Sequence, residues 1–339
     1  MNIYTSLIVI NGHWLMKNLD ICLIFLLTLA IGNGYCDNKE SRDPFIYSEK
    51  MLKKLNDLEN SETGFLPVSF WQSMQANRPL ANQKFLKNHY LKMTKERFEL
   101  FLKEFQSSKI KSDTFAHFSI PPHIHLIWLG SPPPKEVNIA INSWKKHHPK
   151  WIIQLWTDED IAAFNWTSPR SEEIFLKGKN WAEKSDILRF EILYQFGGIY
   201  TDIDVICLKA FDDLMTQGLT CFCCLEIPHI DLLIHAPLIG SAIIGAAQYS
   251  EVMRQCMEYT QTEKEAPGIP QYIRSGPGPL SKACFKALEN RIPSVLILPC
   301  SYFFPLPWTK RLTSFDGLAL KIKPESFAIH LWEFSWKAS

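Results

Sequence analysis

The sequence predicts an α/β domain with a mostly parallel sheet, preceded by a helical N-terminal appendage. From Ile120 onward, short apolar runs alternate with longer stretches of helical spacing, a pattern typical of strand–helix units. The apolar runs are continuous, as expected for strands buried on both faces of a parallel sheet. The chain has 339 residues, of which 46% are hydrophobic, so it can bury a large core.

The N-terminal segment, residues 1–36, has the features of a signal peptide or a signal-anchor. Ile21 to Ile31 is an apolar run that contains no charged residue and follows Lys17. This run is short for a membrane span, which needs about 20 apolar residues, and fits a signal-peptide core. Small residues lie at its end and just after it, at Ala30, Gly32 and Gly34. We expect a protein of the secretory pathway or an exported one, with Met1 or Met16 as the start.

Two alternatives remain for the same segment. A signal-anchor would hold the protein in the membrane, and the charge order around the apolar run would place the body of the chain on the non-cytoplasmic side. Membrane association would then run through this segment. A buried N-terminal helix is the other alternative.

Residues 37–118 form the predicted helical appendage. Aromatic and apolar residues recur at steps of three and four among Lys and Glu, most clearly over Phe85–Phe105.

The domain predicted for residues 119–339 begins with a strand and continues in alternation. The predicted strands are Ile124–Leu129, Ile152–Trp156, Ile199–Ile206 and Val295–Leu298. The predicted helices are Val137–His147, Trp181–Phe196, Glu251–Thr262 and Leu280–Asn290. The proline-rich loop Ser131–Pro134 follows the first strand directly, and ligands of open α/β sheets bind at that end of the strands.

Charge and cysteine content exclude two classes of site. The chain carries 36 basic and 35 acidic residues, a balance that gives no reason to expect nucleic acid as a partner. The nine cysteines include Cys221-Phe-Cys-Cys, which lacks the paired spacing of a zinc site, so we expect small core residues there. Export would permit disulfides, but the sequence assigns no pairs.

The most informative stretch is Trp181–Leu208. A helix is expected to end where Gly197 and Gly198 lead into the next strand. Strand alternation would then place Tyr200, Asp202 and Asp204 on one face. Carboxylates on an otherwise apolar strand are unfavourable unless something compensates them, and Mg²⁺ or Mn²⁺ is suited to do so because it prefers oxygen ligands.

A second pair of charged residues lies on the preceding helix. Asp186 and Arg189 are three residues apart, so they share a helix face. The Asp186 carboxylate would accept hydrogen bonds from ligand hydroxyls, and the Arg189 guanidinium would supply positive charge. Both would lie near the carboxylates of Asp202 and Asp204.

These motifs together resemble the DXD glycosyltransferases of family 32. The resemblance rests on DILR at Asp186–Arg189, GGIY at Gly197–Tyr200 and DID at Asp202–Asp204. That family includes α-mannosyltransferases of the secretory pathway, and the glucosylating domains of large bacterial toxins are related to it. Four further segments look like the family's own, in the right order: Ile120–Gly130 (IPPHIHLIWLG), Ser143–Pro149 (SWKKHHP), Ser275–Leu280 (SGPGPL) and Ala328–Trp336 (AIHLWEFSW).

The resemblance implies a GT-A type, Rossmann-like nucleotide-sugar domain and a retaining, hexosyl-transferring enzyme that uses Mn²⁺ or Mg²⁺. Its partners would be a UDP- or GDP-sugar donor and a glycan, lipid or protein acceptor. Asp202, Asp204, Asp186 and Arg189 would be catalytic, and Asp204, Asp202 and His330 would hold the metal. The donor would contact Trp128, which stacks on the base, together with Leu129, Asp186, Arg189, Gly198, Tyr200, Asp202, Ser335 and Trp336. His330, Ser335 and Trp336 would close over the diphosphate.

The middle of the domain departs from the family. Members often carry Asn before an Ile-Gly pair, whereas Ile239-Gly240 follows Ala236-Pro237-Leu, and Gly245-Ala-Ala-Gln replaces a Gly-His-Pro. This departure motivates an alternative hypothesis, a catalytically silent nucleotide-sugar- or glycan-binding protein on the same fold. A metal-dependent phosphoesterase would need more carboxylate or histidine ligands than the sequence places.

Overall fold

The computed structural model describes residues 120–215, 218–231, 236–290, 292, 294–306 and 322–332. The predicted signal or anchor segment, the predicted appendage over 37–118, Ser335 and Trp336 all lie outside these residues. Among the helices of the described part, none is both long and apolar enough to cross a membrane.

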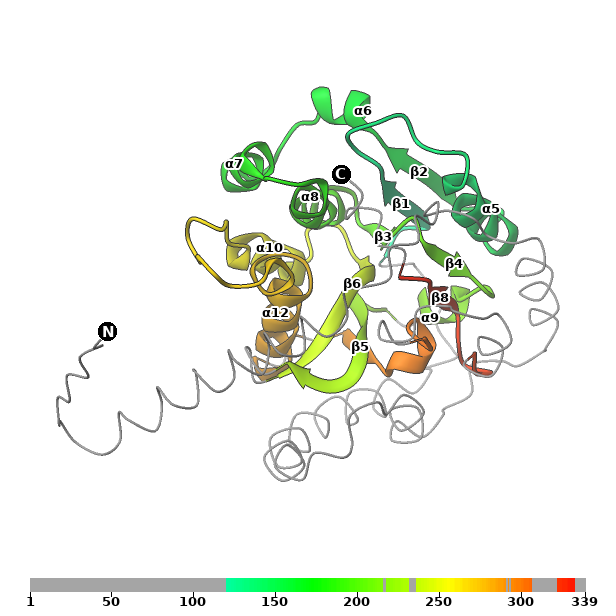
Figure 1. Cartoon of the computed structure of the whole chain (residues 1–339). Helices are drawn as coiled ribbons and strands as arrows, with labels where there is room; N and C mark the ends of the chain where they lie inside the picture. The colour runs from blue at the N-terminus through cyan, green and yellow to red at the C-terminus, as the bar shows by residue number, and fades with distance from the viewer. Residues whose placement is uncertain are drawn as a thin grey trace, which may run out of the picture. The chain divides into compact units, whose positions relative to one another are not determined.

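The described chain alternates strands and helices, as Figure 1 shows. The strands are β1 His123–Ile127, β2 Ile152–Trp156, β3 Gly198–Thr201, β4 Val205–Cys207, β5 Cys221–Asp231, β6 Ala236–Ala246, β7 Val295–Leu298 and β8 Ala328–His330. The helices are α5 Val137–His147, α6 Asp158–Ala162, α7 Pro169–Lys177, α8 Trp181–Phe196, α9 Asp212–Met215, α10 Glu251–Tyr259, α11 Gln271–Arg274, α12 Pro277–Glu289 and the 3₁₀ helix η1 Cys300–Tyr302.

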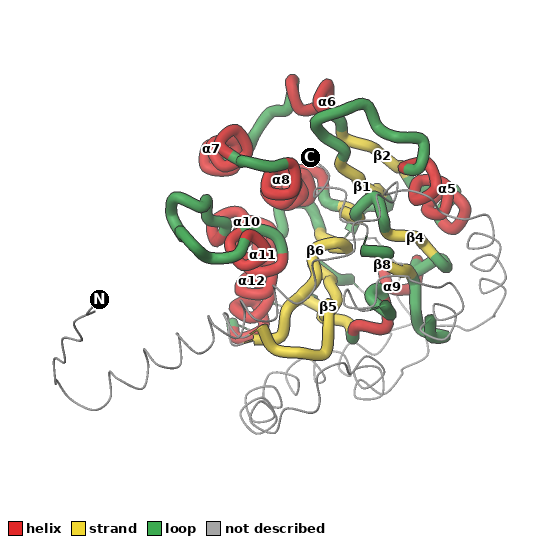
Figure 2. Tube along the Cα trace, viewed as in Figure 1, coloured by secondary structure: helices red, strands yellow, loops and turns green. Residues whose placement is uncertain are grey.

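Six strands form one sheet in the order β2-β1-β3-β6-β5-β7. The pairs β1–β2, β1–β3 and β5–β7 are parallel, and β6 runs antiparallel to both β3 and β5. The predicted α/β class with a mostly parallel sheet is therefore confirmed, and this arrangement is consistent with the GT-A type. Figure 2 shows β5 and β6 as adjacent long strands.

The sheet separates two apolar cores. Successive strand residues point to opposite faces, so Ile199 belongs to one core and Tyr200 to the other. Helices α7, α8, α10 and α12 supply the core on one side, and Figure 1 shows these helices gathered together. Helix α5, the β4–β8 pair and η1 supply the other.

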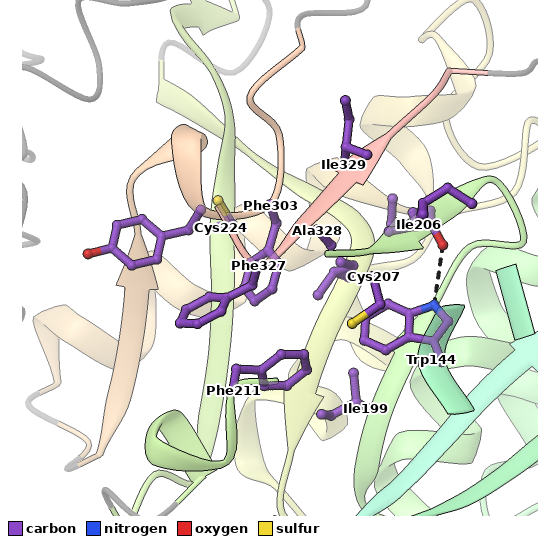
Figure 3. Close-up of a cluster of buried hydrophobic side chains, with 14 of the residues drawn as sticks. Trp144, Ile199, Ile206, Cys207, Phe211, Cys224, Phe303, Phe327, Ala328 and Ile329 are labelled. Atoms are coloured by element: carbon purple, nitrogen blue, oxygen red, sulfur yellow. Dashed lines mark hydrogen bonds between the residues drawn. The ribbon is translucent and has the colours of Figure 1, made fainter. Parts of the chain in front are cut away.

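Figure 3 shows the second core, which lies beneath β4 and β8. Trp144 of α5 is fully buried and donates a hydrogen bond from Nε1 to the Val205 carbonyl at 3.2 Å. Phe211 contacts Trp144, Phe303 and Phe327 in edge or tilted ring packing. The core therefore fixes β4, whose first residue follows the acidic motif.

The single strand predicted over Ile199–Ile206 is wrong. The chain leaves the main sheet after Thr201, turns through Asp202–Asp204, and continues as β4 in a separate two-stranded sheet with β8. The Asp202 amide still donates to the Ala242 carbonyl of β6 at 2.9 Å, and the Val205 amide closes the turn on the Asp202 carbonyl at 3.2 Å. The two carboxylates therefore lie in the turn that follows β3 and not on a strand face.

Most of the other predicted helices and strands are present, with bounds close to those predicted. Helices α5 and α8 and strands β2 and β7 have the predicted bounds, and β1 differs only at its ends. Helix α10 ends at Tyr259, before the predicted Thr262, and α12 begins at Pro277, three residues before the predicted Leu280. Strands β5 and β6 have no counterpart among the elements predicted from the sequence.

Candidate active site

Arg189 is the centre of a buried polar network. It lies on α8, which begins at an Asn180 cap whose side chain accepts from the Glu183 amide. Its Nη1 donates to the carbonyl of Ser241 on β6 at 2.8 Å and lies 3.3 Å from Asp202 Oδ1. The same guanidinium stands over the Tyr200 ring, 4.5 Å from its centroid. Arg189 thus connects α8, β3, β6 and the turn formed by Asp202–Asp204, the acidic turn.

Asp186 pairs with Arg189 as the helix spacing predicted. Its Oδ1 lies 2.9 Å from Arg189 Nη2. Its Oδ2 accepts from Ser275 Oγ at 2.6 Å and from Gln271 Nε2 at 3.4 Å. A Cβ on Gly276 would come within 2.7 Å of Asp186 Oδ1, so glycine at this position leaves room for the carboxylate.

Asp202 is the more exposed of the two motif carboxylates, with 27% of its side chain accessible. Its Oδ1 accepts a 2.6 Å hydrogen bond from the Tyr200 hydroxyl in addition to its contact with Arg189. Tyr200 and Asp202 therefore do approach each other, although the strand has ended between them.

Asp204 and His330 meet across the β4–β8 pair. Val205 is opposite His330 in the register, and the Leu331 amide donates to the Asp204 carbonyl at 3.0 Å. His330 Nε2 lies 3.2 Å from Asp204 Oδ1. Both side chains are almost fully buried, so this contact is shielded from solvent.

The environment changes the proton affinity of the site residues. Burial raises the pKa of Asp186, against the opposing effect of the Arg189 charge. Burial also raises the pKa of Tyr200 well above its usual value, so its hydroxyl remains a donor to Asp202. For His330, burial lowers the pKa, but Asp204 outweighs it and the net shift is upward.

The ligand atoms of Asp202, Asp204 and His330 lie within 4.8 Å of one another. Two carboxylates and an imidazole suit a borderline divalent cation such as Mn²⁺, and the carboxylates suit Mg²⁺. The network contains three carboxylates, those of Asp186, Asp202 and Asp204, and one guanidinium, that of Arg189. An additional positive charge would therefore be favourable. The sequence predicted these three residues as metal ligands, and the structure brings them together.

Of the other predicted donor residues, Trp128 and Leu129 lie at the carboxyl end of β1, and Gly198 lies in β3. Trp128 is half-buried and donates from Nε1 to Ser131 Oγ at 3.3 Å. The Leu129 side chain is buried in the core on the α8 side. Gly198 has a packing reason to be glycine: its φ is +98°, and a Cβ there would lie 2.4 Å from the His123 carbonyl oxygen.

Three residues of the network were not predicted from the sequence. Ser241 anchors Arg189, and Ser275 and Gln271 anchor Asp186. The Ser275–Leu280 segment carried a signal, because its Gly-Pro turn resembled the family. Ser241 carried none, since it lies in a strand that the apolar pattern did not reveal.

The acidic turn and the Asp186–Arg189 pair lie in a segment of the chain that matches a known family of sugar-binding regions. Residues 134–219 match the family model described as "Glycosyltransferase sugar-binding region containing DXD motif". The matched segment includes Asp186, Arg189 and both carboxylates of the acidic turn. The resemblance to DXD glycosyltransferases is thereby confirmed.

Two curated relatives are glycosyltransferases by name. The chain is 34% identical over 107 residues to inositol phosphoceramide mannosyltransferase 1 of Schizosaccharomyces pombe, covering 29% of this chain and 32% of that protein. It is 32% identical over 103 residues to the uncharacterized glycosyltransferase L373 of Acanthamoeba polyphaga mimivirus, covering 29% and 41%. The chain thus spans less than half of the length of these curated relatives.

Among solved structures, the chain is similar to the PaToxG glycosyltransferase. The match has a TM-score of 0.40 and 18% sequence identity, and it covers 58% of this chain and 80% of that one.

Proposed function

We propose that this protein is a metal-dependent, retaining glycosyltransferase that moves a hexosyl group from a UDP- or GDP-sugar to a glycan, lipid or protein acceptor. The observation that carries the proposal is the convergence of Asp202, Asp204 and His330 beside the Asp186–Arg189 pair. A nucleoside diphosphate leaving group needs positive charge, and a sugar needs hydroxyl acceptors. This network offers a site for both.

Asp202, Asp204 and His330 would hold Mn²⁺ or Mg²⁺. A bound cation would neutralise the negative charge that develops on the diphosphate leaving group. Trp128 would stack on the base, because its indole lies at the carboxyl end of β1 beside the Ser131 loop.

Asp186 and Arg189 would orient the sugar. Asp186 Oδ2 is fixed by Ser275 and Gln271, and Arg189 is fixed by Ser241, so neither side chain has to be ordered when the donor binds. The contacts proposed for Leu129, Gly198, Tyr200, Ser335 and Trp336 rest on the family resemblance.

The names of the relatives guide the choice of substrates. One of them is an inositol phosphoceramide mannosyltransferase, so a nucleotide-activated mannose and a lipid with an inositol phosphate headgroup are the first pair to test. For location, the proposal is a lumen of the secretory pathway, entered through the apolar segment Ile21–Ile31 as a signal peptide or an anchor.

Binding and turnover measured together test the proposal. The full-length protein is titrated with each UDP- or GDP-sugar by calorimetry in Mn²⁺, and released nucleotide is measured in the same samples. An enzyme binds one donor and releases its nucleotide, faster with acceptor present. Donor binding without release, with or without the inositol phosphate lipid, would favour the catalytically silent binding protein.

A further inference from the structure

Four cysteine side chains gather between the sheet and the helices that cover it. Cys221 and Cys223 are two residues apart on β5, so they point to the same face. Cys256 of α10 and Cys284 of α12 belong to the same core. All four are fully buried. The glycosyltransferase proposal assigns none of them a role.

Two of these sulfurs are in direct contact. Cys223 Sγ lies 3.4 Å from Cys284 Sγ, although the residues are 61 positions apart. The sulfurs must approach by roughly 1.4 Å to reach the disulfide bond length of about 2.05 Å. We propose that Cys223 and Cys284 form a disulfide that joins strand β5 to helix α12 when the protein folds in an oxidising compartment.

The oxidant is a low-molecular-weight disulfide such as oxidised glutathione. One protein thiolate attacks it, which forms a mixed disulfide and releases one small thiol. The second protein thiolate then attacks the mixed disulfide, which closes the Cys223–Cys284 bond and releases the second small thiol. Two protein thiols are thereby oxidised, and one small disulfide is reduced to two thiols.

The burial of both sulfurs determines when the bond can form. Burial raises the pKa of Cys223 well above its usual value, and hydrogen bonding to Cys221 raises the pKa of Cys284. Neutral thiols are poor nucleophiles, and the core has no room for a mixed disulfide with glutathione. The bond therefore forms during folding, before α12 packs completely on the sheet.

The bond would strengthen an interface that supports the site. On α12, Ser281 Oγ accepts from the Ile239 amide of β6 at 2.8 Å. The residue Ser275, which precedes α12, donates to Asp186 Oδ2. A covalent link between β5 and α12 would constrain the unfolded chain and stabilise this wall of the network. The inference depends on the folding compartment and not on catalysis.

Mass spectrometry after oxidative refolding tests the inference. The full-length protein is refolded with oxidised and reduced glutathione, or with reduced glutathione alone, and free thiols are alkylated before digestion with trypsin. We expect the peptide ACFK, residues 283–286, linked to the peptide that contains Cys223, with fragment ions that assign Cys223. The oxidised protein should melt about 5–10 °C above the reduced one.

Single variants assign the pair. The link should persist in Cys221→Ala, in Cys224→Ala, and in the control Cys207→Ala, which removes a buried thiol of the other core. It should be absent in Cys223→Ala and Cys284→Ala. Full alkylation of Cys223 and Cys284 in the refolded wild-type protein would overturn the proposal, as would fragment ions that place the link at Cys221. Neither result would bear on sugar transfer, which is measured separately.

Discussion

His330 Nε2 lies 3.2 Å from Asp204 Oδ1, so a residue from the last described strand completes the acidic turn that follows β3. The pairing of β4 with β8 produces this contact, because Val205 is opposite His330. The candidate metal site therefore depends on a two-stranded sheet built from segments that are distant in sequence.

The first prediction concerns this histidine. Removing the imidazole in His330→Ala takes one of three neighbouring ligand atoms from the cluster, so Mn²⁺ affinity should fall at least about tenfold. Calorimetric titration with Mn²⁺ measures the change. His147→Ala is the matched control, since His147 ends α5 and is not part of the cluster. Equal affinity in His330→Ala and the wild type would exclude His330 as a ligand.

Arg189 should be important for stability as well as for donor binding. It is almost fully buried between Asp186 and Asp202, so Arg189→Met leaves two carboxylates without their cation. We expect the free energy of unfolding to fall by about 3–5 kcal/mol. Denaturant titration at neutral pH measures it.

The control for this substitution is Arg254→Met. Arg254 also pairs with two carboxylates, those of Glu251 and Glu258, but 42% of its side chain is exposed. Its removal should change the free energy of unfolding by less than about 1 kcal/mol. Equal losses in the two variants would contradict the importance of burial.

The acidic turn shows what the sequence could not reveal. The bounds of α8 follow from the Asn180 cap before it and the glycines after it, and both of these signals are local. The end of β3 depends on Asp202 bonding to Ala242, and β4 exists because β8 pairs with it. Both partners are remote in sequence, so the local pattern of Ile199–Ile206 predicts one strand where the structure has two. Asp186 and Arg189 could be paired from the sequence because helix spacing alone brings them together.

Gly198 tests whether packing or ligand contact explains a predicted site residue. In Gly198→Ala the added Cβ would meet the His123 carbonyl at 2.4 Å in a backbone conformation with φ of +98°. We expect a loss of more than about 2 kcal/mol in the free energy of unfolding from strain and displacement together. Gly268→Ala has a similar φ of +75° and open space around the Cβ, so it should lose only about 1 kcal/mol. Thermal unfolding compares them, and equal losses would contradict the packing argument.

His148 makes stability depend on pH. It is buried among Trp144, Trp151 and Phe211, and neither ring nitrogen has a hydrogen-bond partner within the described residues. Burial lowers its pKa to about 4. As the pH falls below about 6.5, the unfolded chain therefore takes up a proton before the folded one does, and stability is lost until the pH reaches about 4.

The variant His148→Phe should lack this contribution. Its free energy of unfolding should fall less steeply than that of the wild type between pH 6.5 and 4, by up to about 1.4 kcal/mol per pH unit. Denaturant titrations at several pH values measure the slopes, and parallel curves for His148→Phe and the wild type would refute the assignment.

Nucleotide release tests the central claim, that the acidic turn supports metal-dependent sugar transfer. Released nucleotide is measured for the full-length protein over a panel of UDP- and GDP-sugars with Mn²⁺ or with EDTA, beside the variant Asp202→Ala/Asp204→Ala. The account predicts release from one donor in Mn²⁺, none in EDTA and none from the folded double variant. Release that persists in EDTA, or undiminished release by the double variant, would contradict it.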